Sequence, residues 1–171
     1  VLIGLSSIPW REAWKYGERA FRYCQHDVGH ALGALRFSAS RLGWAVRLLP
    51  RWSDDHVAVL LGLDHPEGEA DVEVEEPECL LVVTPGAPEP WVAADPAPLL
   101  EAARGTSWSG RANSLSPAHV AWDVVTAMAA ATRAPAGAGL HRPSVPAGRA
   151  APDVAVPAAG APAGPPAAVP A

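Results

Sequence analysis

The sequence predicts a single α+β domain over residues 1–133, followed by a tail over 134–171. Three observations support this: a long amphipathic helical pattern over 18–42, short apolar runs typical of strands over 44–49 and 79–84, and an abrupt change of composition at position 134. The chain has 171 residues, of which 49% are apolar, and this is enough for one hydrophobic core.

The helix expected over 18–42 is the strongest element. Its apolar residues recur three and four positions apart, at Phe21, Cys24, Val28, Ala31, Leu32, Leu35, Ala39 and Leu42. Gly29 and Gly33 each cost a helix roughly 1 kcal/mol relative to alanine. Their presence in this segment therefore predicts a close crossing with another helix. We expect a core helix or a dimer-interface helix.

A short strand and a short helix are expected after the long helix. The strand covers 44–49 and is stopped by Pro50, which cannot donate a ladder hydrogen bond. The helix covers 54–61, because Ser53 is a favourable N-cap and Gly62 is a favourable residue just past the C-terminus.

The second half of the expected domain alternates polar and apolar stretches. An acidic stretch over 64–78 predicts a solvated loop, and the apolar run over 79–84 predicts a buried strand. A Pro-rich connection then leads to a short helix over 98–104 that ends at Gly105, and a last helical stretch runs from Ser116 and Pro117 to Arg133.

The tail over 134–171 is expected to be disordered. Ala, Pro and Gly account for 28 of its 38 residues, and such a composition cannot bury enough apolar surface to offset the entropy of ordering. A frame-shifted translation of GC-rich DNA is an alternative origin for this composition. At the other end, the apolar start at Val1 predicts that further sequence lies upstream.

The charge pattern argues against a nucleic-acid partner, since the net charge is −5 and the arginines are scattered along the chain. Cys24 and Cys79 lack metal-ligand spacing and are expected to be small buried hydrophobic residues in a reducing compartment. No apolar run reaches the length of a membrane span and no signal peptide is recognisable, so we expect no membrane partner and a cytoplasmic location.

Cations, aromatic residues and histidines gather between residues 7 and 30. Lys15-Tyr16, Arg22-Tyr23 and Gly29-His30 supply six positions within 16 residues that match one pattern. In these residues the chain resembles the nitroreductase superfamily, and within it the branch that includes the azoline dehydrogenases. The resemblance extends from about Leu5 to Arg133 and implies the C-terminal half of a nitroreductase-like α+β fold.

The resemblance implies an FMN-dependent oxidoreductase that transfers hydride between the flavin and either a nicotinamide nucleotide or a small-molecule or peptide substrate. It also implies a homodimer, or an intramolecular pseudo-dimer with a second nitroreductase-like half. Lys15 and Tyr16 match a pair associated with azoline oxidation and are the expected catalytic residues. We expect Arg11, Arg19 and Arg22 to contact the cofactor.

A catalytic role for Lys15 as a base requires a lowered pKa. Arg11 and Arg19 lie four residues before and after Lys15, and we expect their charges to lower the pKa of its ammonium group.

Two alternative functions remain open from the sequence. The first is a catalytically inactive half-domain that supports dimerisation, since the Gly-rich turn usual after the long helix of a nitroreductase is missing here. Residues 107–122 also resemble the connector between the halves of tandem nitroreductase-like proteins, which would make this chain the end of a first half. The second is a metal hydrolase, because His26 and His30 lie one helical turn apart with Asp27 between them, similar to zincins. Aspartate is one methylene shorter than the glutamate of that motif, and we expect no metal at this site.

Overall fold

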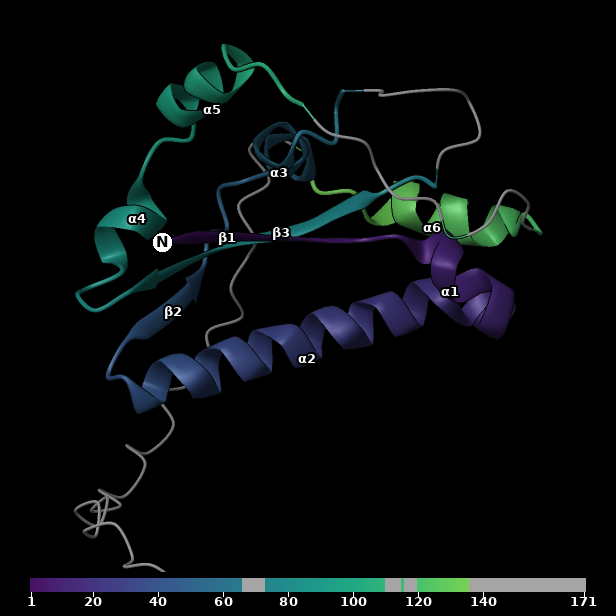
Figure 1. Cartoon of the computed structure of the whole chain (residues 1–171), viewed down its shortest axis with the longest axis horizontal. Helices are drawn as coiled ribbons and strands as arrows, with labels where there is room; N and C mark the ends of the chain where they lie inside the picture. Colours follow the sequence, from purple (N-terminus) through teal and green to yellow (C-terminus); the bar gives the residue numbers. More distant parts are fainter. Residues whose placement is uncertain (66–72, 110–114, 116–119, 136–171) are drawn as a thin grey trace, which may run out of the picture. The chain divides into compact units, whose positions relative to one another are not determined.

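The computed structural model describes residues 1–65, 73–109, 115 and 120–135 (Figure 1). Its elements in chain order are β1 (Leu2–Ser7), α1 (Pro9–Tyr16), the 3₁₀ turn η1 (Gly17–Arg19), α2 (Ala20–Arg41), β2 (Ala45–Leu48), α3 (Asp54–Leu61), β3 (Glu76–Thr84), α4 (Glu89–Ala93), α5 (Ala97–Arg104) and α6 (Asp123–Thr132). Helices and one antiparallel sheet are therefore combined, which confirms the α+β class. The expected tail from 136 onward, the acidic stretch over 66–72 and the expected start of the last helix at 116–117 lie outside the described residues.

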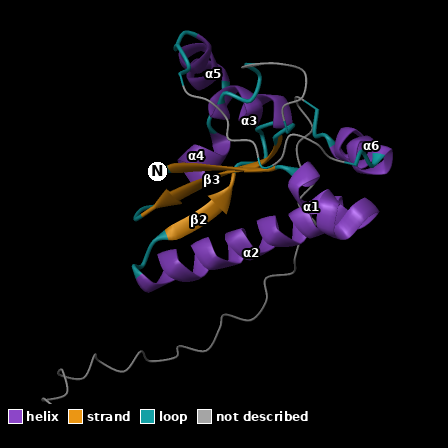
Figure 2. Cartoon of the chain, turned by 45° about the vertical axis from the view of Figure 1, so that its right-hand side comes forward, coloured by secondary structure: helices purple, strands orange, loops and turns teal. Residues whose placement is uncertain are grey.

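The sheet has three antiparallel strands in the order β1-β3-β2. The central strand β3 is apolar on both faces because helices cover both sides of it, α2 on one and α3 on the other (Figure 2). Leu81 and Val83 point to the α2 side, whereas Leu80 and Val82 point to the α3 side. The expectation of a buried strand at 79–84 is therefore confirmed, with the strand beginning three residues earlier than expected.

The short helix α3 is capped as its sequence predicts. The Ser53 hydroxyl accepts a hydrogen bond from the His56 backbone N–H over 3.2 Å, and Gly62 follows the helix with a φ of 73°.

The first sixteen residues fold into a strand and a helix that no local sequence pattern predicts. β1 pairs with β3, and α1 follows it directly, with Pro9 at the first helical turn. Gly17 ends α1 with a φ of 56°, and α2 begins three residues later at Ala20. We call this junction of α1, η1 and α2 the elbow.

The long helix has the expected position, but the predicted close crossing is wrong for the described residues. A Cβ added to Gly29 or Gly33 would meet no described atom within 4 Å. Only Ala20, Cys24 and Ala39 are buried along α2, while Phe37 is 73% exposed. The helix packs on the sheet through one narrow line of side chains, so both glycines lie on an open surface.

Replacing Gly33 with alanine is expected to stabilise the chain. The added methyl group meets no neighbour, and alanine is favoured over glycine inside a helix by roughly 1 kcal/mol. Denaturant unfolding of the variant and the parent measures the difference. A loss of stability would show that another part of the chain approaches Gly33 closely.

Two further expectations need correction. The Pro-rich connection after β3 contains the helix α4, because Pro90 stands in the first turn, where its missing N–H is not needed. The last helix begins only at Asp123, with Trp122 as its N-cap residue. No helix in the described part of the chain is long and apolar enough to cross a membrane.

Candidate functional site

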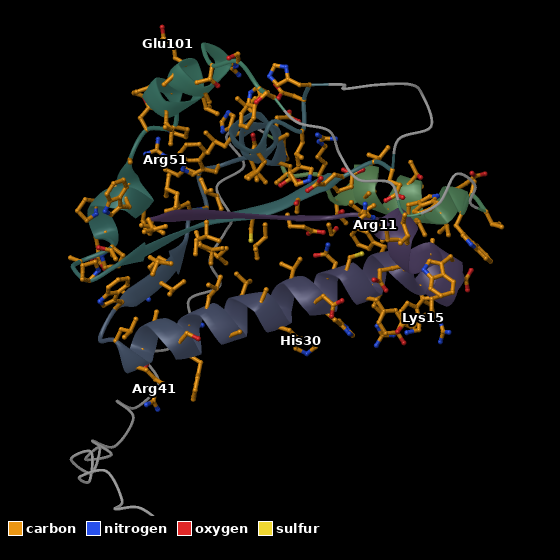
Figure 3. All side chains as sticks on the ribbon, viewed as in Figure 1. Arg11, Lys15, His30, Arg41, Arg51 and Glu101 are labelled. Atoms are coloured by element: carbon orange, nitrogen blue, oxygen red, sulfur yellow. The ribbon has the colours of Figure 1, made fainter. Side chains whose placement is uncertain are left out.

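The elbow brings together the residues that the sequence singled out as catalytic. The rings of Tyr16, at the end of α1, and Tyr23, in α2, stack with their centroids 3.9 Å apart and their planes at 20°. The Lys15 Nζ lies 5.0 Å from the centroid of the Tyr16 ring, and the His26 ring meets Tyr23 edge-on at 6.3 Å. We call these four residues the elbow face. Lys15, in α1, lies near the end of α2 that joins the elbow, and Arg41 lies at the opposite end of α2 (Figure 3).

The pKa of Lys15 is shifted in the direction opposite to the expected one. Its ammonium group is exposed, and its pKa is raised above the ordinary 10.5, first by the side-chain hydrogen bond to Tyr16 and then by electrostatic attraction to the same side chain. The expected lowering by Arg11 and Arg19 is therefore wrong for the described residues. Water screens their charges at this exposed position, and Arg11 is paired with a carboxylate. Lys15 is protonated at neutral pH.

Arg11 takes part in a partly buried ion pair rather than facing an open site. Its guanidinium Nε donates to Glu73, whose side chain is 3% exposed, and Glu73 also accepts from the backbone N–H of Leu115. Arg19 and Arg22, the other two expected cofactor ligands, have exposed side chains and make no hydrogen bond or ion pair to any described residue. Arg19 lies three residues after Tyr16, Arg22 directly precedes Tyr23, and both side chains are accessible to solvent.

The described end of the acidic stretch is not the solvated loop that the sequence predicted. Ser6 donates to Glu75, and Ser7 donates to Glu78 over 2.5 Å. Gln25 of α2 donates to the second oxygen of Glu78 over 2.8 Å. These carboxylates tie β1 and α2 to the start of β3. Pairing of the strands puts Ser6 opposite Pro77 and Ser7 opposite Glu76, and each serine bonds a carboxylate two residues from its paired position. Charge alone could not reveal these partners.

A cleft of about 230 Å³ lies between the elbow end of α2, the start of β3 and the end of α6. Its lining includes Phe21, Trp52, Asp54, Glu76, Glu78 and Arg133. None of the five residues expected at the flavin site lines it.

This cleft does not fit FMN. Its volume is below the roughly 300–1,000 Å³ of typical ligand sites. It presents three carboxylates and one guanidinium, an unfavourable environment for a phosphate dianion. This cleft is therefore not an FMN site by itself.

The histidines of α2 have separate surface neighbours. The His30 Nδ1 lies 3.6 Å from Asp27 Oδ1, with both side chains mostly exposed, whereas His26 contacts Tyr23. Among the described residues, no group of three histidine, cysteine or carboxylate side chains is placed to hold a metal ion. In the described structure, the two histidines with zincin-like spacing therefore have different partners, Asp27 for His30 and Tyr23 for His26.

The cysteines have the packing role expected from the sequence. Both are free, Cys24 is buried in α2, and Cys79 is half-buried in β3. Burial raises the pKa of the Cys24 thiol, and burial followed by the charge of Glu78 raises that of Cys79 to about 11. Both thiols stay protonated at neutral pH, so neither is an activated nucleophile.

Comparison with known proteins leaves the family open, since no protein-family model matches the chain and no curated protein or solved structure gives a significant match.

The raised pKa of Lys15 can be measured directly, because Lys15 is the only lysine of the chain. Lysine labelled with ¹³C gives one set of side-chain signals, whose shift with pH follows the ammonium group. We expect a pKa above 10.5 in the parent and a lower one in Tyr16→Phe, which lacks the hydroxyl that bonds Lys15. Tyr23→Phe, which keeps that hydroxyl, is the control and should retain most of the shift. Equal values in the parent and Tyr16→Phe would contradict this account of the shift.

Proposed function

We propose that this chain supplies one part of the site of a flavin-dependent oxidoreductase of the nitroreductase type, and that a second polypeptide segment completes the site. The observation that carries the proposal is the elbow face, where two stacked tyrosines and a protonated lysine lie at the surface. Stacked rings beside exposed Arg19 and Arg22 suit a flat aromatic ligand that carries a phosphate group.

The surface around the elbow and along α2 favours a second polypeptide segment that packs against it, which we call the complement. Large apolar side chains are unusually exposed there, with Trp14 at 71%, Phe37 at 73% and Leu42 at 65%. Apolar surface of this kind marks an interface when it is contiguous. We take the complement to be a second nitroreductase-like half, either in the same polypeptide or in a second copy of the chain. Such a complement would also cover the open glycines of α2 and account for their small size.

The raised pKa changes the role expected of Lys15. A lysine that stays protonated at neutral pH cannot remove a proton from a substrate, but it can donate one or stabilise an anion. FMN would supply hydride transfer in the completed site. Within this chain, Lys15 holds a proton at its Nζ beside the Tyr16 hydroxyl, and Tyr23 fixes the orientation of the Tyr16 ring.

A supporting half without catalytic activity is the second candidate. The ion pair of Arg11 and Glu73 favours it, because a guanidinium that is bound to a carboxylate is poorly available to a phosphate. In this case the elbow face would contact protein rather than flavin.

Turnover of the longest polypeptide encoded at the same locus separates the two candidates. The proposal predicts flavin reduction by NADH or NADPH, or oxidation of an azoline peptide, that is lost in Lys15→Ala. If activity is present and is unaffected by Lys15→Ala and by Tyr16→Phe, the elbow face is not part of the site and the supporting role is favoured.

A further inference from the structure

Trp122, the N-cap residue of α6, lies directly against the backbone of the elbow. A Cβ added to Gly17 would stand 3.0 Å from Cζ2 and 3.3 Å from Cη2 of the Trp122 indole. Gly17 also has a φ of 56°, in the left-handed region that favours glycine. A side chain at position 17 would therefore be strained by the backbone conformation and would push the indole, which is 40% exposed, outward by a few tenths of an ångström.

The next turn of α6 enters the inside of the elbow. Val125 is 7% exposed and packs with Ala13 of α1 and Ala20 of α2, which are 6% and 0% exposed. Both arms of the elbow carry alanine at this contact, which leaves room for the valine. Val125 is the one buried residue of α6. Trp122 and Val125 thus attach a helix from late in the chain to a turn near its beginning.

The Tyr16–Tyr23 stack depends on the geometry of this turn. Tyr16 directly precedes Gly17, and Tyr23 lies six residues after it, so the two rings meet only when the chain turns between α1 and α2 as it does here. Glycine alone leaves the backbone at position 17 with a wide choice of conformations. A packed indole restricts that choice.

We propose that Trp122 is a positioning residue that fixes the angle between α1 and α2 and thereby holds Tyr16 and Lys15 in place. The catalytic role of Tyr16 and Lys15 in this inference rests on the proposed function. The contact of Trp122 with the elbow does not depend on that function. Because α6 has so little buried surface, this indole contributes much of its attachment to the elbow.

Oxidative coupling of tyrosines tests the proposal in the full 171-residue chain. The sequence contains two tyrosines, and both belong to the stack. A photoexcited ruthenium complex with persulfate as the oxidant removes one electron and one proton from each phenol, and adjacent rings join through a carbon–carbon bond. The fluorescence of the intramolecular dityrosine product, measured on the monomer at low concentration, reports how often the rings meet.

We expect a several-fold loss of dityrosine in Trp122→Ala and recovery in Trp122→Phe, which restores a flat ring over Gly17. Trp91→Ala removes an indole that is 49% exposed on α4 and is the matched control, with an unchanged yield. If circular dichroism shows that Trp122→Ala is unfolded, Trp122→Leu, which keeps an apolar side chain over Gly17, takes its place with the same expected loss. A parental yield in a folded Trp122 variant without an aromatic ring would overturn the proposal.

The longer polypeptide separates this inference from the proposed function. If Trp122 positions a working site, Trp122→Ala lowers kcat with FMN occupancy unchanged, and Trp122→Phe restores it. Loss of dityrosine in a protein that never binds flavin would keep the positioning role of Trp122 and refute the proposed function. Normal dityrosine yield in a folded Trp122→Ala variant of an active flavoprotein would refute the positioning role of Trp122 and keep the proposed function.

Discussion

Lys15→Ala in the completed protein is expected to lower kcat by roughly 10²–10⁴-fold, the range that a positioned proton-transfer group contributes. The Lys15 Nζ is protonated and close to the Tyr16 ring, so its loss removes both a proton donor and a positive charge from the elbow face. FMN occupancy should not change, because the phosphate is expected to bind arginine side chains and not Lys15. Single-turnover flavin reduction separates the chemical step from binding.

Arg41→Ala is the control for this experiment. Arg41 is also an exposed cation on a helix, but it lies at the end of α2 away from the elbow (Figure 3). Its removal should leave kcat at the parental value. Equal rates in Lys15→Ala and Arg41→Ala would place Lys15 among ordinary surface residues.

Leu81→Ala is expected to destabilise the chain by about 2–5 kcal/mol, the cost of removing a large buried aliphatic side chain. Leu81 is 1% exposed in the central strand and packs with Val46 and Ala39 beneath α2. Helices cover both faces of β3, so we expect the surrounding structure to relax only in part around the cavity. Urea unfolding measures the loss as a lower midpoint at an unchanged slope.

Leu48→Ala provides the matched comparison on the neighbouring strand. Leu48 pairs with Leu81 across the sheet but is 43% exposed. Its truncation should cost far less than that of Leu81. Similar losses for both variants would indicate that Leu48 is covered in solution, as expected if a complement packs over this surface.

Local sequence patterns predicted most of the regular structure. The apolar spacing along α2, the Ser53 and Gly62 caps of α3 and the apolar run of β3 each depend on neighbouring residues, so they can be recognised without the fold. β1 was not assigned, because its burial depends on pairing with β3, about 75 residues away. The close crossing predicted from Gly29 and Gly33 was wrong for the described chain, because a glycine shows only that space is available.

The candidate site was predicted in part. The adjacency of Lys15 and Tyr16 follows from the sequence, but the Tyr23 stack depends on the turn at Gly17 and on α6, which no local pattern reveals. The pKa of Lys15 was expected to fall because Arg11 and Arg19 are near it in the sequence. Arg11 is instead bound to Glu73, a contact between residues 62 positions apart. Electrostatics of this kind require the tertiary structure.

The FMN content of two purified proteins tests the central proposal most directly. One is the 171-residue chain, and the other is the longest polypeptide encoded at the same locus. Because the cleft in the described residues is small and acidic, the proposal predicts no stable FMN on the monomer of the 171-residue chain. It predicts close to one FMN per site in the longer protein, measured by flavin absorbance after gel filtration, with reduced occupancy when Arg19 and Arg22 are both replaced by alanine. Absence of flavin from the longer protein, after incubation with excess FMN, would contradict the proposal and leave a supporting role for this chain.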